Sequence, residues 1–238
     1  MNILNTLVKK NKIADNKINI DISGMVRSFE GNIIETDAFP ATVGSICEIE
    51  CINTENTTAE IIGFRNNKNL IAMHRTDNNV RIGSKVKLIN DGVNISVGDD
   101  LLGRVLDGMG EPLDGKYKIS SNENWPLYGK TINPLQRKKV DSEFDVGVRS
   151  INSLTTIGRG QRIGIIAGSG VGKSILLQMM SKYSVADVVV VGLIGERARE
   201  VKTMVETLTK FDENNKIIIV AVPADRSPLL RMRGANRC

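Results

Sequence analysis

The residues best suited to chemistry lie in a glycine-rich run in the second half of this 238-residue chain. The run reads Ala167-Gly168-Ser169-Gly170-Val171-Gly172-Lys173-Ser174, and Ile175 follows it. Its spacing matches the phosphate-loop pattern G-x-x-x-x-G-K-[ST], except that alanine stands where glycine is usual at the first position. An apolar run at 163–166 precedes it and a helix-like pattern follows, which is the setting such a loop requires. The sequence therefore predicts a loop that binds the phosphates of a nucleoside triphosphate.

The residue types in this run each have a physical reason. Gly168, Gly170 and Gly172 let the backbone bend so that successive N–H groups point inward, and they leave room for phosphate oxygens. The helix that begins near Gly172 adds the positive end of its dipole, roughly half a unit charge. The Lys173 ammonium can reach the β- and γ-phosphates, and the Ser174 hydroxyl can take one position on Mg²⁺. We therefore expect residues 168–175 to bind the nucleotide and Ser174 to be a metal ligand.

A second candidate for chemistry is Glu196, at the carboxyl end of the next predicted strand. In an open parallel sheet, ligands bind beyond the carboxyl ends of the strands. A carboxylate there can orient or activate a water molecule against the γ-phosphate. The same carboxylate could instead cap the helix that starts at Arg197, because acidic side chains favour that end of a helix. The residues alone support the two interpretations equally.

Hydrophobic periodicity predicts the elements that must position these residues. Short alternating runs between residues 18 and 90, separated by glycine and asparagine turns, predict a small β-barrel or sandwich, with strands at 33–35, 45–52, 59–64, 70–73 and 84–89. From residue 140 onward the pattern is α/β, with strands at 161–167, 187–194 and 216–222 and helices at 172–183 and 197–210. Met204, Val205 and Leu208 give the second helix an apolar face, which we assign to packing rather than to a cofactor.

The predicted organisation has four parts. Residues 1–18 form an N-terminal docking segment, 19–90 the barrel, 91–139 a connector rich in glycine and proline, and 140–238 the phosphate-loop domain. The apolar spacing within residues 1–18 is close to helical. A short amphipathic helix that docks on a partner or a membrane surface and a frayed, solvated terminus both fit that pattern.

Composition excludes several classes of protein. A chain with 41% apolar and 25% charged residues can build packed domains, and its net charge of +5 comes without a strong basic cluster, so we predict no nucleic-acid partner. No apolar run approaches the ~20 residues that span a bilayer, and no secretion signal opens the chain, so we predict a cytoplasmic protein.

His74 is the only histidine, which argues against a histidine metal cluster, and we expect it at the surface or at an edge. Cys47 and Cys51 are expected to be small buried hydrophobes.

Several groups of residues, taken with the glycine-rich loop, resemble a known family. They read Asp145-Val146-Gly147-Val148-Arg149-Ser150-Ile151-Asn152, Gly158-Arg159-Gly160-Gln161-Arg162 and Val191-Gly192-Leu193-Ile194-Gly195-Glu196-Arg197. In this order they resemble the rotary-type ATPases related to the catalytic subunits of ATP synthase. Residues 223–225 and 227–232 are most similar to those of flagellar protein-export ATPases, with the injectisome-type (type III) secretion ATPases as the near alternative. The likeness is dense from residue 101 to residue 235 and only architectural before that.

The resemblance implies a fold and a set of roles. The fold is α/β: a small N-terminal β-barrel, a RecA-like phosphate-loop domain with a parallel sheet, and a C-terminal helical domain, assembled as a hexamer. Lys173 and Ser174 would bind ATP with Mg²⁺, and Glu196 would be the catalytic carboxylate. Arg197, in the family's Gly-Glu-Arg motif, would steady Glu196 or the metal shell.

The resemblance also implies partners and a location. The partners would be the regulator of the export ATPase, other proteins of the flagellar export apparatus, and exported flagellar proteins with their chaperones. Residues 1–18 would bind the regulator, which favours the docking interpretation of this segment. The protein would be cytoplasmic and peripheral at the export apparatus of the inner membrane.

The family pattern continues beyond this sequence. After residues 232–235 the family has a helix, then a strand that ends in an Mg-associated aspartate, then an arginine finger and the helical domain. This sequence ends at residues 236–238, where we expect the helix to begin. An early stop, a frameshift or a fragment would each explain this. We therefore expect the phosphate-loop domain to be incomplete, with apolar strands at 163–166 or 188–194 exposed and hydrolysis weak. The competing hypotheses are an export ATPase and a non-catalytic remnant that binds partners and nucleotide weakly.

Overall fold

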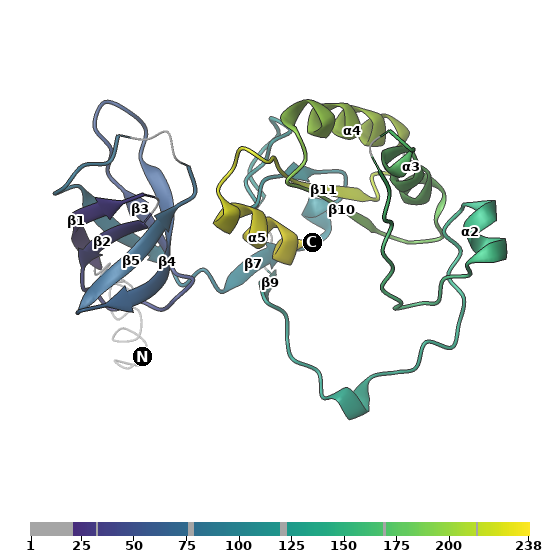
Figure 1. Cartoon of the computed structure of the whole chain (residues 1–238), viewed down its shortest axis with the longest axis horizontal. Coiled ribbons are helices and arrows are strands. Elements are labelled where there is room, and N and C mark those ends of the chain that lie inside the picture. The colour runs from purple at the N-terminus through teal and green to yellow at the C-terminus, as the bar shows by residue number, and fades with distance from the viewer. Residues whose placement is uncertain (1–20, 32, 76–78, 120–122, 169, 213) are drawn as a thin grey trace, which may run out of the picture.

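The computed structural model describes residues 21–31, 33–75, 79–119, 123–168, 170–212 and 214–238. These form a β-barrel and, beside it, a parallel sheet with its helices, as Figure 1 shows. The predicted docking segment, residues 1–18, lies outside the described residues. The predicted fold class, a small barrel followed by a partial RecA-like domain with a parallel sheet, is confirmed.

Six antiparallel strands close the barrel in the order β1-β2-β5-β4-β3-β6. They are β1 (Ser23–Glu30), β2 (Ile33–Asp37), β3 (Ile46–Ile49), β4 (Thr57–Arg65), β5 (Lys68–Met73) and β6 (Lys85–Asn90). Alternate side chains point inward, so that Ile34, Ile61 and Ile71 meet in a core from which solvent is excluded. Cys47 belongs to this core and Cys51 is partly buried, and both thiols are free. Burial raises the pKa of the Cys47 thiol to about 12.

Gly92, where the chain leaves the barrel, has a backbone that only glycine adopts without strain. Its φ is +66°, and a Cβ atom would lie 1.8 Å from the carbonyl oxygen of Gly44. Gly31 offers a matched control, because its φ of +61° is similar but no heavy atom lies within 4 Å of its Cβ position.

We expect Gly31→Ala to lower the free energy of unfolding by about 1–2 kcal/mol, the cost of the left-handed conformation. Gly92→Ala should cost at least about 2 kcal/mol more, because the backbone must also move away from Gly44. Urea unfolding of the two variants measures the difference. Equal losses would show that the contact with Gly44 is not tight in solution.

The segment after the barrel contributes a strand to the parallel sheet. Strands β7 (Asn94–Val97) and β9 (Glu123–Pro126) form a small antiparallel pair, and the single turn η2 (Asp99–Leu101) leads into β8 (Val105–Leu106). Strand β8 pairs with β11 in parallel. The sequence pattern indicated only glycine-rich turns here, because a two-residue strand has no periodicity to detect. Beyond β9 the chain swings away from the sheet through the turn η3 (Pro134–Gln136), as Figure 1 shows.

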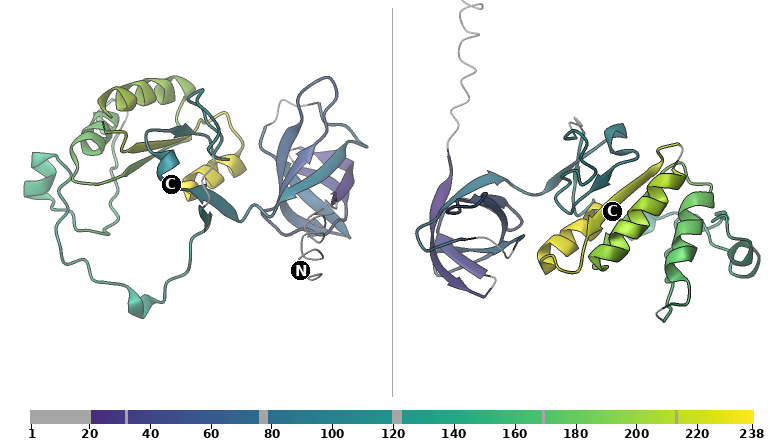
Figure 2. Two further views of the ribbon diagram at one scale, coloured as in Figure 1. Left: turned by 180° about the vertical axis from the view of Figure 1, so that it is seen from behind. Right: turned by 90° about the horizontal axis from the view of Figure 1, so that it is seen from above.

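The parallel sheet has the order β10-β11-β8 and is covered by a helix on each face. Strand β10 (Val189–Ile194) and strand β11 (Ile217–Val222) both carry runs of β-branched residues. Strand β11 is buried on both faces, whereas β10, at the edge of the sheet, leaves Val190 exposed. Helix α4 (Ala198–Phe211) packs on one face through Val201, Met204 and Leu208, which confirms the predicted apolar face. Helix α5 (Pro228–Arg237) packs on the other face, as the right view of Figure 2 shows.

The prediction of a strand at 161–167 is wrong. Residues 161–168 carry no strand pairing, and the side chain of Ile166 is fully exposed. A run of β-branched residues becomes a strand only when its backbone groups find a neighbouring edge, and β10, at the edge of the sheet, does not pair with it. The expected exposure of apolar residues is confirmed, since Ile163, Val188 and Val190 are each more than 40% exposed.

Two further expectations are corrected. The helix expected to begin at the very end of the sequence is α5, which begins at Pro228 with the Ser227 hydroxyl accepting a hydrogen bond from the N–H of Leu230. Proline at the first helical position and serine before it are the usual start signals. His74, expected at the surface, is 2% exposed. Its ring lies between the Thr58 hydroxyl and the Glu60 carboxylate, which also faces Arg233 of α5, and periodicity within one strand cannot reveal these contacts.

Helices long and apolar enough to cross a membrane are absent from the described ranges.

Candidate nucleotide-binding site

The glycine-rich loop leads directly into helix α3 (Lys173–Tyr183). Gly170 has a φ of +77° and Gly172 a φ of +100°, so both lie in the left-handed region that favours glycine. Among the described residues, no heavy atom beyond the adjoining ones lies within 4 Å of the Cβ positions of Gly168, Gly170 or Gly172, so the space beside the backbone is open there. Ser169 lies outside the described residues. The loop therefore has the backbone shape and free space of an anion cradle at a helix N-terminus.

Helix α3 is held in place by a small apolar cluster ahead of it. Val146 and Val148 pack with Leu176 and Met180 of α3, close to the short helix α2 (Arg149–Leu154). The sharp turn before α2 is held by Asp145, whose carboxylate accepts hydrogen bonds from the N–H of Gly147 and the side-chain amide of Asn152. These bonds, the one from Gly147 foremost, lower the pKa of Asp145. The cluster thus fixes the direction in which the helix N-terminus points.

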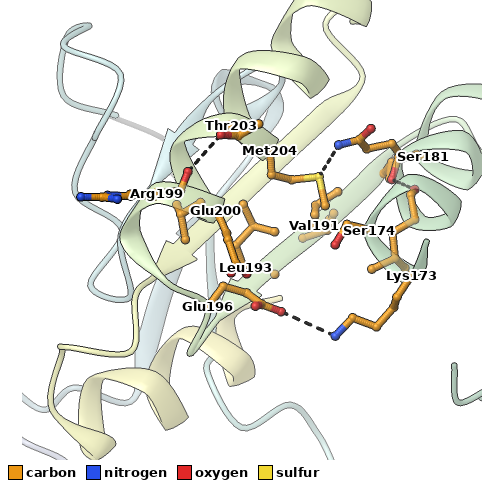
Figure 3. Close-up of a pocket in the computed structure, with 16 residues that line it drawn as sticks. Lys173, Ser174, Ser181, Val191, Leu193, Glu196, Arg199, Glu200, Thr203 and Met204 are labelled. Atoms are coloured by element: carbon orange, nitrogen blue, oxygen red, sulfur yellow. Dashed lines mark hydrogen bonds and ion pairs between the residues drawn. The ribbon is translucent and has the colours of Figure 1, made fainter. Parts of the chain in front are cut away.

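Lys173 and Ser174 occupy the first turn of α3, as Figure 3 shows. The Lys173 ammonium lies 3.9 Å from Oε1 of Glu196, which is within ion-pair range but too far for a hydrogen bond. Both side chains are more than 40% exposed. The ammonium is therefore accessible to an anionic ligand, with the Glu196 carboxylate facing it from across the site.

Glu196 is placed by the end of β10 rather than by a helix cap. Gly195 turns the chain with a φ of +77°, and its N–H donates to the carbonyl of Val222 at 2.8 Å. The carbonyl of Glu196 in turn accepts from the N–H of Ala224 at 2.9 Å. The N-cap of α4 is Arg197, with no side-chain cap hydrogen bond. This geometry favours the interpretation in which the Glu196 carboxylate serves the site over the one in which it caps the helix.

One cavity gathers most of the predicted residues. It measures about 490 Å³ and is lined by Ala167, Gly168, Gly170, Gly172, Lys173, Ser174, Ile175, Glu196 and Glu200. Val171 and Arg197 are exposed and do not line it. Glu200, in the first turn of α4, was missed by the sequence reasoning. Glu196 precedes α4, so helical spacing does not relate the two residues, and no pattern in the sequence marked Glu200.

A second cavity of about 500 Å³ adjoins the first and shares Lys173, Ser174, Glu196 and Glu200 with it. Its walls are the apolar side chains of β10 together with Leu177 of α3 and Met204 of α4. The amide of Gln178 bridges the two helices by donating to the sulfur of Met204 at 3.1 Å. The site as a whole therefore lies between α3, α4 and the carboxyl end of β10, where open α/β sheets bind their ligands (Figure 3).

The residues of the loop fit a nucleotide with its magnesium ion. The open space beside three glycines takes phosphate oxygens, and the Ser174 hydroxyl is an oxygen ligand of the kind that Mg²⁺ uses. Among the described residues no group of three or more His, Cys, Asp or Glu side chains could hold a metal ion by itself. A magnesium ion at Ser174 would also be held by the phosphates of the nucleotide, as is usual for phosphate-loop sites.

Fold and site together define a phosphate-loop nucleotide-binding protein. Residues 147–238 match the nucleotide-binding domain of the ATP synthase alpha/beta family, so this part of the chain belongs to that family. The chain is 40% identical over 222 residues to the flagellum-specific ATP synthase of Pseudomonas aeruginosa, covering 91% of this chain and 49% of the relative. It is 42% identical over 216 residues to the protein of the same name from Aquifex aeolicus, covering 91% of this chain and 48% of the relative.

The solved structures give the same picture. The assembled ATPase EscN in complex with its central stalk EscO, from the type III secretion system of enteropathogenic E. coli, matches with a TM-score of 0.78 at 35% identity. The match covers 90% of this chain and 52% of EscN. The chain spans about half the length of the curated relatives it matches. The recognition from sequence of a rotary-type ATPase, most similar to the flagellar export enzymes, is confirmed.

Proposed function

We propose that this chain forms the nucleotide-binding part of an ATPase that energises the export of flagellar proteins. The observation that carries the proposal is the open glycine cradle at the N-terminus of α3, with Lys173 facing Glu196 across it. The relatives named flagellum-specific ATP synthase, about 40% identical, support the flagellar assignment. An injectisome-type secretion ATPase is the second candidate, favoured by the likeness to EscN.

The roles of the residues follow from their positions. The backbone N–H groups of the loop and the Lys173 ammonium bind the phosphate tail of ATP, and Ser174 holds Mg²⁺ through its hydroxyl. Magnesium, when bound, neutralises charge on the phosphates. The Glu196 carboxylate orients the attacking water and accepts its proton, while Lys173 stabilises charge that develops on the transferred phosphoryl group. Arg197 does not line the cavity, and its proposed role of steadying Glu196 or the metal shell rests on the Gly-Glu-Arg motif alone.

The proposed partners come from the relatives. EscN is described as assembled and bound to a central stalk, so we propose that the complete protein forms a ring, most simply a hexamer. Its partners would be the regulator of the export ATPase, the export apparatus, and exported flagellar proteins with their chaperones. We place the protein in the cytoplasm, at the inner-membrane face of that apparatus, with residues 1–18 as the docking segment.

Phosphate release from Mg-ATP by the purified chain tests the proposal. We expect release that falls at least about a hundredfold in Lys173→Ala, because the ammonium stabilises the transition state in a partly desolvated site. The matched control is Lys202→Ala, since Lys202 is an exposed lysine of α4 whose ion pair with Glu206 lies at the surface. Equal release by all three proteins would remove the ATPase assignment. Nucleotide binding without any release would favour the non-catalytic remnant.

A further inference from the structure

Three buried polar side chains meet where the barrel touches helix α5. They are Glu60 of β4, His74 just beyond β5, and Arg233 of α5, with exposed fractions of 4%, 2% and 5%. Glu60 and His74 belong to the barrel, whereas Arg233 is almost 160 positions further along the chain on the helix that covers the parallel sheet. The cluster lies away from the nucleotide site, and none of its members lines either cavity of that site.

A single carboxylate oxygen is the centre of the cluster. Oε2 of Glu60 lies 3.6 Å from Nη1 of Arg233 and 3.5 Å from Nε2 of His74. The His74 ring is oriented by its other nitrogen, which lies 3.1 Å from the Thr58 hydroxyl, and by its backbone N–H, which donates to the Thr58 carbonyl. Glu60 and His74 are therefore positioned by contacts within the barrel, and Arg233 is the member of the cluster that α5 contributes.

Arg233 also binds the segment between the two parts of the molecule. Its Nη2 donates to the carbonyl of Gly92 at 3.0 Å, and Gly92 is the residue whose backbone fits tightly against Gly44 of the barrel. The same helix is closely packed on the sheet, because a Cβ atom at Gly234 would lie 2.5 Å from the Val222 side chain. One guanidinium thus connects a barrel strand, the exit segment and a helix that lies on the ends of β10 and β11.

We propose that Glu60, His74 and Arg233 form a polar lock that fixes the orientation of the barrel against the parallel sheet through α5. Glu60 and Arg233 are both buried and face each other in this arrangement, so a different docking of the barrel on α5 would bury one charge without its partner. The cluster therefore favours this orientation of the barrel at Gly92 over any arrangement that buries only one of the two charges. The inference is independent of nucleotide binding, and its test contains no nucleotide.

The test is a double-mutant cycle on the rate of proteolysis at the exit segment. Asn90 and Asp91 are exposed, so a protease that cleaves before aspartate can attack the bond between them once the segment opens. We expect Glu60→Leu and Arg233→Met each to speed cleavage there by about tenfold or more, because Arg233 is left buried with only the Gly92 carbonyl and Glu60 with only the His74 ring. The double variant leaves neither charge, so its rate should return to within about threefold of the starting protein. Mass spectrometry identifies the cleaved bond.

The control is Arg27→Met, which removes a barrel ion pair to Asp37 that is exposed, and it should leave the rate unchanged. Unchanged rates in both single variants would overturn the lock, as would a double variant in which the two effects multiply. If a single variant does not fold but the double variant does, the coupling is supported. If no variant regains a folded barrel by circular dichroism, the cluster is part of the core and the lock is overturned.

Discussion

Glu196→Gln is expected to lower ATP turnover by about 10²–10⁴-fold while leaving the affinity for Mg-ATP nearly unchanged. Glutamine keeps the shape of the side chain and its hydrogen-bonding oxygen but cannot accept a proton from the attacking water. The Glu196 carboxylate lies 3.9 Å from the Lys173 ammonium, so its place in the site is set by the end of β10 and does not depend on that ion pair. Loss of charge should therefore affect the chemical step far more than binding.

Steady-state phosphate release and equilibrium titration with Mg-ATP separate the two effects. The matched control is Glu206→Gln on the outer face of α4, where the side chain is 66% exposed and pairs only with Lys202 at the surface. Turnover in that control should not change. If Glu196→Gln weakened binding as much as turnover, Glu196 would be a binding residue and its assignment as the base would be wrong.

The second large effect concerns the buried ion pair that supports β8. The side chain of Arg104 is 4% exposed and donates to both carboxylate oxygens of Asp114, at 2.7 and 3.1 Å, and to the carbonyl of Tyr117 at 2.8 Å. Asp114 also accepts from the N–H groups of Val105 and Lys116. Asp114→Asn leaves the guanidinium buried without its charge partner, so we expect the free energy of unfolding to fall by about 3–5 kcal/mol at pH 7.

This effect has a defined pH dependence. The hydrogen bond from Arg104 is the main reason that the pKa of Asp114 is lowered from 3.8 to about 2. A carboxyl whose pKa is lower in the folded state stabilises the protein above pH 3.8, and that stabilisation is lost as the pH falls through about 2. The pKa shift alone corresponds to about 2 kcal/mol. The difference in unfolding free energy between parent and variant, measured by urea unfolding, should therefore narrow by about 2 kcal/mol between pH 4 and pH 2.

Asp37→Asn is the control for the buried pair. Asp37 makes a similar bidentate contact with Arg27, but both side chains are at least 40% exposed, so the change should have little effect on the free energy of unfolding. A loss at Asp114 as small as that at Asp37 would contradict the stabilising role of the buried pair. A difference between variant and parent that stays constant down to pH 2 would contradict the lowered pKa.

The sequence could predict the elements whose residue types and spacing within one segment are sufficient to identify them. The loop before α3 could be recognised because glycine, lysine and serine at fixed spacing have one main chemical use, and helix α4 because Met204 and Leu208 repeat at helical spacing. The segment 161–168 has the residues of a strand, but pairing requires a partner strand that periodicity does not specify. The short strand β8 could not be predicted because its two residues show no strand pattern. They form a strand because β11 lies beside them and pairs with them.

Long-range contacts account for the other differences. The buried His74 faces Glu60, which also faces Arg233 far along the chain, and no pattern around His74 indicates these neighbours. Glu200 lines the nucleotide cavity because α4 begins where β10 ends, which brings its first turn back to the site. In both cases the residue types were visible in the sequence, whereas the neighbour that gives them a role was not.

Titration calorimetry with Mg-ATP tests the central claim most directly, because it asks whether the loop before α3 binds a triphosphate. We expect one saturable binding event in the purified chain, with a melting temperature that rises as the nucleotide concentration exceeds the dissociation constant. Both signals should be lost or strongly weakened in Lys173→Ala and kept in Lys202→Ala. Absence of binding heat and an unchanged melting curve in the parent protein would contradict the account.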